Sequence, residues 1–145
     1  MTPYAEEVNY WHTSKSDPDS WIEKAKRQVE TLGATVKAQG FGHAEGKMAY
    51  MLGFEIGADK FKVIWPVLPQ KYVGNERGAK IQAATMLYHY VKAVCLFAVV
   101  AGPKTAFFSH YMLPDGRMAA EVATDELTSM TPRLLLKGAE GKSDG

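Results

Sequence analysis

Residues 47–67 carry the pattern that most constrains the fold of this chain. Within 47–56 every second side chain is large and apolar, and the same alternation resumes in 60–67. A period of two sustained in this way is typical of β-strands with one buried face, and the Gly-Ala-Asp segment between the runs is typical of a tight turn. The pattern therefore predicts a β-hairpin with one core face and one solvent face. The predicted core face consists of Tyr50, Leu52, Phe54, Phe61, Val63 and Trp65.

Two helices are predicted on either side of these strands. Residues 18–32 place apolar side chains at helical spacing, Pro18 suits the first turn, and Gly33 suits a left-handed cap. A longer helix is predicted over 75–101, amphipathic in its first half and apolar on nearly every side in its second half. A helix of that kind is buried on several sides, so we expect a sheet and either later segments or a second copy to cover it.

This order of elements predicts an α+β fold. We expect an antiparallel sheet of three or more strands (about 34–42, 47–56 and 60–67) packed on the long helix (about 75–101). The N-terminal helix (about 18–32) and a small helical C-terminal region, with a short final helix near residues 117–130, complete the prediction. We expect a single domain over residues 1–136 and a flexible tail over 137–145, whose composition is typical of disorder.

Charge and cysteine content limit the kinds of site that the chain can form. The 17 basic and 16 acidic residues give a net charge of +1, so an electrostatic site requires local clustering. The single cysteine, Cys95, excludes an intramolecular disulfide and a cysteine-based zinc site, and its apolar neighbours predict a core residue.

The sequence also bears on location. The N-terminus has no basic region followed by an apolar run, and the longest apolar stretch falls short of the roughly 20 residues of a spanning helix. We expect a soluble, cytoplasmic protein (in the host cell, if it is phage-encoded) with no membrane partner.

Motifs that would indicate an enzyme are weak. The four histidines have no spacing typical of a metal site, and the carboxylates are scattered, so we expect no metal and no cofactor. For His89 we expect a partly buried ring bonded to a neighbour. Catalysis by His110 with an acid such as Asp115 stays open as an alternative, although the sequence favours a protein that is not an enzyme.

Basic residues concentrate on the hairpin and on the segment that follows it, and aromatic residues are interleaved with them. Single-stranded nucleic acid is bound by this combination, because the cations contact phosphates and the rings stack on bases. An alternative is a solvated sheet face whose lysines only protect an edge from aggregation. The candidate nucleic-acid-binding residues are Lys47, Lys60, Lys62, Lys71, Tyr72, Arg77 and Lys80.

Two resemblances bear on function. Residues 60–122 combine a proline-rich turn, a helix of pattern RxAxxQAxxxLYxxVKA that begins at Arg77, an aromatic patch and the turn LPDGR over Leu113–Arg117. This combination resembles a loose group of uncharacterised phage and prophage proteins. The order of helix, antiparallel hairpin sheet and long helix is also similar to Rad52-like single-strand annealing proteins, which form rings that bind single-stranded DNA along a basic groove.

These observations lead to one functional prediction and one alternative. We expect a non-enzymatic accessory protein of phage or mobile-element type that binds or anneals single-stranded DNA. We also expect it to form a homo-oligomer through the apolar half of the long helix. The alternative is a protein-interaction or inhibitor module that acts through the aromatic patch Phe107–Met112.

Overall fold

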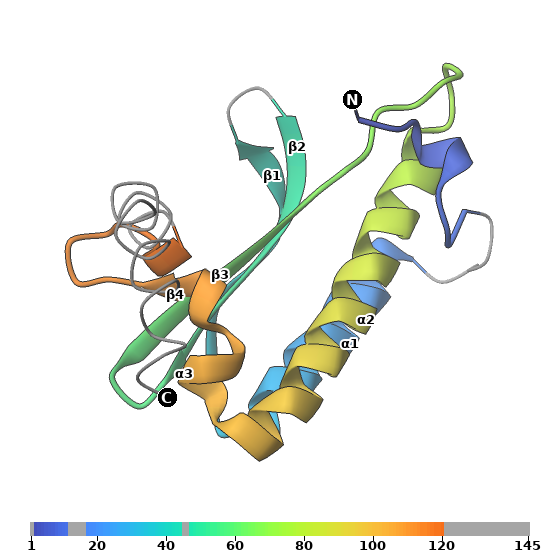
Figure 1. The fold of residues 1–145 in the computed structure, drawn as a ribbon. Coiled ribbons are helices and arrows are strands. Elements are labelled where there is room, and N and C mark those ends of the chain that lie inside the picture. Colours follow the sequence, from blue (N-terminus) through green and yellow to red (C-terminus); the bar gives the residue numbers. More distant parts are fainter. Residues whose placement is uncertain (1, 12–16, 45–46, 121–145) are drawn as a thin grey trace, which may run out of the picture.

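The computed structural model describes residues 2–11, 17–44 and 47–120 of the chain (Figure 1). The elements are η1 (Ala5–Glu7), α1 (Pro18–Glu30), β1 (Thr35–Ala44), β2 (Lys47–Ile56), β3 (Asp59–Pro66), α2 (Glu76–Ala101), α3 (Pro103–Ala106), η2 (Phe108–His110) and β4 (Tyr111–Met112). The predicted α+β fold is confirmed, including the N-terminal helix, the three long strands and the long helix. The expected tail at 137–145 and most of the expected final helix lie outside the described residues.

The strands form one antiparallel sheet in the order β1-β2-β3-β4. In the central register Tyr50 of β2 lies opposite Phe41 of β1 and Trp65 of β3. A bulge at Lys37 interrupts the pairing of β1 with β2. The short strand β4, which was not predicted, pairs only with the start of β3, because two residues are too few to show an alternation in the sequence.

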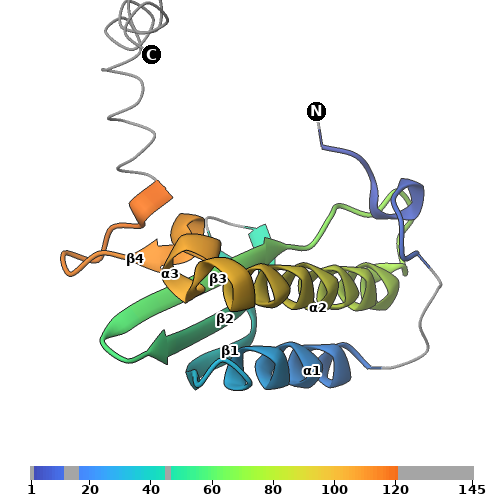
Figure 2. The same ribbon diagram turned by 60° about the horizontal axis from the view of Figure 1, so that its bottom comes forward.

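Helices α1 and α2 lie side by side and cover one face of the sheet (Figures 1 and 2). The predicted core face of the hairpin is buried against them, with Leu52, Phe54 and Val63 almost fully excluded from solvent. Cys95 is buried, as predicted. The opposite face of the sheet is not covered by any described helix, and this open face carries the candidate site.

The N-terminal segment packs against the first half of α2. The side-chain amide of the buried Gln82 donates hydrogen bonds to the carbonyls of Ala5, Val8 and Asn9, at 2.8, 3.1 and 3.0 Å. The ring of Tyr10 stacks on His89, with ring centroids 5.0 Å apart. The expectation of a partly buried His89 was wrong, because the residue is exposed, although its ring also contacts Trp21 of α1.

Candidate nucleic-acid interface

The open face of the sheet is lined by small side chains. Facing residues of an antiparallel pair point to the same side, so the pairs Gly53–Lys62 and Met51–Ile64 both lie on this face. The face is flat because Ala38, Gly40, Gly42, Ala49 and Gly53 supply at most a methyl group each. Among the described residues this face is not covered by a helix, and its small side chains leave room for an extended ligand beside Met51 and Ile64.

Two adjoining hollows run across this face. One, of about 340 Å³, lies between Lys37, Lys60 and Met112, and the other, of about 240 Å³, lies toward Phe41 and His43 at the edge of β1. Met51 and Lys62 line both hollows, so together they form one shallow groove across β1, β2 and β3.

The charge of this face is predominantly positive. By the strand alternation, Lys47, Lys60 and Lys62 belong to it, and Lys37 joins them through the bulge. Among the described strand residues of this face, Glu55 is the only acidic one. Its carboxylate forms ion pairs with Lys37 (Nζ–Oε2 3.5 Å) and with Lys60 (Nζ–Oε1 3.9 Å). Exposed ion pairs of this kind contribute little, so both lysines can exchange Glu55 for a phosphate at low cost.

The other predicted site residues lie elsewhere. Lys80 is on the helix side of the sheet, because its Nζ lies 4.4 Å from the centroid of the Phe41 ring and Phe41 pairs with the buried Tyr50. The Arg77 guanidinium is bonded to the Asp17 carboxylate at the start of α1.

Lys71 and Tyr72 lie in the loop that precedes α2, and the Tyr72 ring is exposed with the Lys71 ammonium 5.9 Å from its centroid. The structure thus separates the predicted site into two groups. The sheet group comprises Lys47, Lys60 and Lys62, and the helix group comprises Lys71, Tyr72, Arg77 and Lys80.

The helix group already holds an anion supplied by the chain itself. The Glu6 carboxylate accepts hydrogen bonds from the backbone nitrogens of Lys71 (2.9 and 3.0 Å) and Tyr72 (3.1 Å) and from the Asn75 side-chain amide (2.8 Å). Desolvation acts to raise the pKa of Glu6, but these hydrogen bonds outweigh it and lower the pKa to about 2. No local pattern predicts this contact, since Glu6 and Lys71 are 65 positions apart.

The residues of the enzymatic alternative are not brought together. The His110 ring forms a hydrogen bond with the Tyr90 hydroxyl (Nε2–O 2.6 Å), and burial lowers its pKa despite a hydrogen bond to the Lys62 backbone. Asp115 is instead bonded to the backbone and guanidinium of Arg117, which lower its pKa. Neither His110 nor Asp115 lines any of four hollows found among the described residues.

The aromatic patch of the other alternative is mainly core. Phe107 is fully buried and contacts Phe54 and Phe61, with ring centroids 5.2 and 5.9 Å apart. Phe108 is exposed, whereas Tyr111 and Met112 form the short strand β4. A partner would therefore meet little of the patch that the sequence singled out.

Comparisons with protein-family models, with curated proteins and with solved structures find no match to this chain. No group of three or more His, Cys, Asp or Glu side chains suited to a metal ion is found in residues 2–11, 17–44 and 47–120. The functional argument therefore depends on the geometry of the open face.

Proposed function

We propose that this protein is a non-enzymatic accessory protein that binds single-stranded nucleic acid across the open face of its sheet. The observation that carries the proposal is a groove that no described helix covers, rimmed by lysines, in which two lysines share the Glu55 carboxylate. The phosphate contacts are assigned to Lys37, Lys47, Lys60 and Lys62. A phage or mobile-element origin remains a prediction from the resemblance.

The shape of the groove favours a single strand. Unpaired bases can lie against a flat sheet and stack on exposed rings, as in other sheet-based single-strand binders. Phe41 and His43 line the groove at the edge of β1, but they lie opposite Tyr50 and Met48, so strand alternation turns their rings to the helix side of the sheet. Bases on the open face would therefore lie against the side chains of Met51 and Ile64, whereas Tyr72 lies with the helix group.

Fluorescence anisotropy of a labelled single-stranded oligonucleotide at 50 and 200 mM salt tests this proposal. Four phosphate contacts on a single strand predict an affinity loss of about 50-fold over that range, because each contact releases roughly 0.7 of a counterion. The double variant Lys60→Glu/Lys62→Glu removes two contacts, so its salt dependence should fall to about 7-fold and its affinity should drop at both salt concentrations.

The matched control is Arg27→Glu/Lys92→Glu, which makes the same charge change at two exposed positions of the helix layer. It should retain most of the binding. Equal losses in the two double variants would show that binding follows net charge alone and would refute a site on the sheet. Absence of binding by the unmodified protein at 50 mM salt would refute the proposed function itself.

A third variant, Lys71→Glu/Arg77→Glu, tests the helix group separately. We expect it to weaken binding less than the sheet variant, because the Arg77 guanidinium is already paired with Asp17 and the Glu6 carboxylate is bonded to the backbone of Lys71. A larger loss here than in Lys60→Glu/Lys62→Glu would move the site to the start of α2.

A further inference from the structure

The second half of α2 exposes a stripe of apolar side chains on its outer side. Ala93, Leu96, Phe97 and Val100 recur at helical spacing on the side opposite the buried Val91, Cys95 and Ala98. We call these four residues the outer stripe. Leu96, Phe97 and Val100 are 72%, 52% and 82% exposed, and the neighbouring Val99 is 75% exposed.

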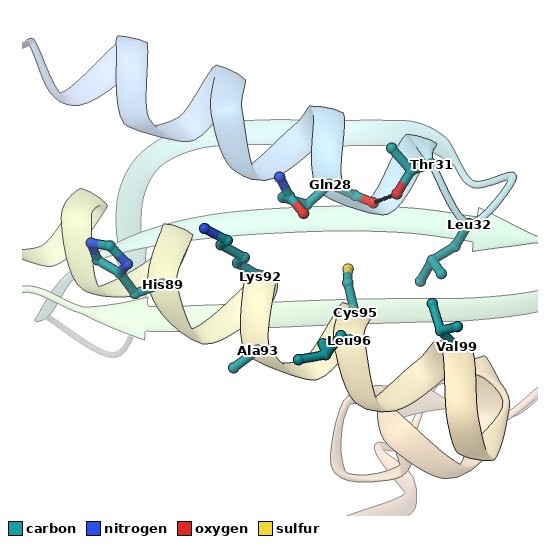
Figure 3. Close-up of a pocket in the computed structure, with 9 residues that line it drawn as sticks. All are labelled: Gln28, Thr31, Leu32, His89, Lys92, Ala93, Cys95, Leu96 and Val99. Carbon is teal, nitrogen blue, oxygen red and sulfur yellow. Dashed lines mark hydrogen bonds between the residues drawn. The ribbon is translucent and has the colours of Figure 1, made fainter.

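A hollow of about 420 Å³ lies beside the outer stripe, between α1 and α2 (Figure 3). Leu32, in the turn after α1, and Val99 of α2 face each other at one end of it, and Lys92 and His89 lie at the other end. The stripe and the hollow together give this side of the molecule a ridge next to a cavity. Such a surface can be complementary to itself when two copies meet about a two-fold axis.

The charge distribution favours a second copy as the occupant. No charged residue lies between Ala93 and Ala101, so two outer stripes can face each other without placing like charges together. A bilayer is the less suitable partner, although α2 is long and apolar enough to cross one by length and composition. The inner side of α2 holds Leu87, Val91 and Cys95 in the core, and crossing a bilayer would remove them from it.

The exposed apolar area supplies the larger part of a small dimer interface. The exposed fractions of Leu96, Phe97, Val99 and Val100 together correspond to roughly 400 Å² per copy, at about 150 Å² for a fully exposed side chain of this size. Two copies would bury roughly 800 Å² from these side chains alone, and the polar rim brings the total toward the ~1,200 Å² at which standard interfaces begin.

We infer that two copies of this chain associate through the outer stripe of α2 to form a two-fold dimer. The helices cover the side of the sheet opposite to the open face (Figure 2). Association through the outer side of α2 therefore turns both open faces away from the interface. This consequence rests on the proposed function: the dimer would present two nucleic-acid grooves and could hold two strands at once.

Sedimentation velocity of the full chain from about 1 to 100 µM, a range that covers ordinary protein affinities, tests the dimer without nucleic acid. We expect a species of twice the 16.0 kDa chain mass. Leu96→Lys and Val100→Lys should each weaken dimerisation by at least about 30-fold, the size of a hot-spot effect, because an interfacial cation then faces its own copy. Both positions are exposed, so far-UV circular dichroism should be unchanged.

Val73→Lys is the matched control, since Val73 is fully exposed in the loop before α2 and its substitution should leave the dimer intact. A monomer at every concentration would overturn the inference, as would a dimer that persists in both stripe variants. Co-flotation of a monomer with phosphatidylcholine–phosphatidylglycerol vesicles, lost in Leu96→Lys, would overturn it in favour of a membrane surface.

A second readout concerns the two grooves. Two oligonucleotides that carry a donor and an acceptor dye should show energy transfer with the unmodified protein. Leu96→Lys should bind each oligonucleotide in anisotropy without bringing the two together. A dimer that binds no oligonucleotide would refute the proposed function and leave the interface standing, so the two failures are distinguishable.

Discussion

Substitution of Gly78 by alanine tests how the N-terminal arm is attached to α2. Gly78 lies in the first turn of the helix, directly under the ring of Trp11. A Cβ atom built at Gly78 would lie 2.6 Å from Cη2 and 2.9 Å from Cζ3 of that ring. Both distances are well inside van der Waals contact, so the ring has to move if the methyl group is present.

Two opposing effects determine the sign of the change in stability. Replacement of glycine by alanine in a helix stabilises by about 1 kcal/mol when the site is open. Forcing an extra carbon into an occupied space costs about 1–3 kcal/mol. We therefore expect Gly78→Ala to lower the free energy of unfolding by about 1 kcal/mol. In a Trp11→Ala background the clash is absent, so the same substitution should raise it by about 1 kcal/mol, a coupling of about 2 kcal/mol between the two positions.

Urea unfolding followed by far-UV circular dichroism measures all four members of this cycle. Gly53→Ala is a useful control because its Cβ would meet the Ala38 Cβ at 3.6 Å, an ordinary contact, and its stability should be unchanged or slightly higher. If Gly78→Ala stabilises the protein equally with and without the Trp11 ring, the arm does not pack on α2 as described and the reasoning fails.

Two further predictions concern single carboxylates. Glu55→Gln removes the acid that Lys37 and Lys60 share, so it should tighten single-strand binding by about 2- to 5-fold, the size of an exposed ion-pair effect, in the anisotropy assay; weaker binding would contradict a phosphate site on this face. Glu6, whose pKa falls from 4.5 to about 2 in the folded protein, contributes stability that is fully present above pH 4.5 and is lost as the pH falls from 4.5 toward 2. Acid unfolding of Glu6→Gln should therefore lack this part of the pH dependence, and identical acid profiles for the two proteins would contradict the Glu6 contacts.

The sequence alone was sufficient for the two main helices and the three long strands. The alternation over 47–67 predicted the hairpin and its core face, and Leu52, Phe54 and Val63 are buried there. Pro18 and Gly33 marked the ends of the first helix correctly to within a few residues. These predictions succeed because strand alternation, helical spacing and turn chemistry depend on neighbours along the chain.

The candidate site was only partly predictable. Lys47, Lys60 and Lys62 share a face because β-strand alternation places them there. Because Lys80 follows these lysines closely in the sequence, it was predicted to belong to the same site. The packing of α2 instead places Lys80 on the other side of the sheet, against Phe41. Proximity along the chain does not determine which face of a sheet a following helix will cover.

Tertiary structure alone decided the contacts between distant segments. Glu6 is tied to the loop before α2, and the buried Gln82 is bonded to three carbonyls of the N-terminal arm. In the sequence these are ordinary polar residues with no distinguishing neighbours. Their roles arise because the packing of the N-terminal arm on α2 brings these side chains within hydrogen-bond distance of backbone groups of distant segments.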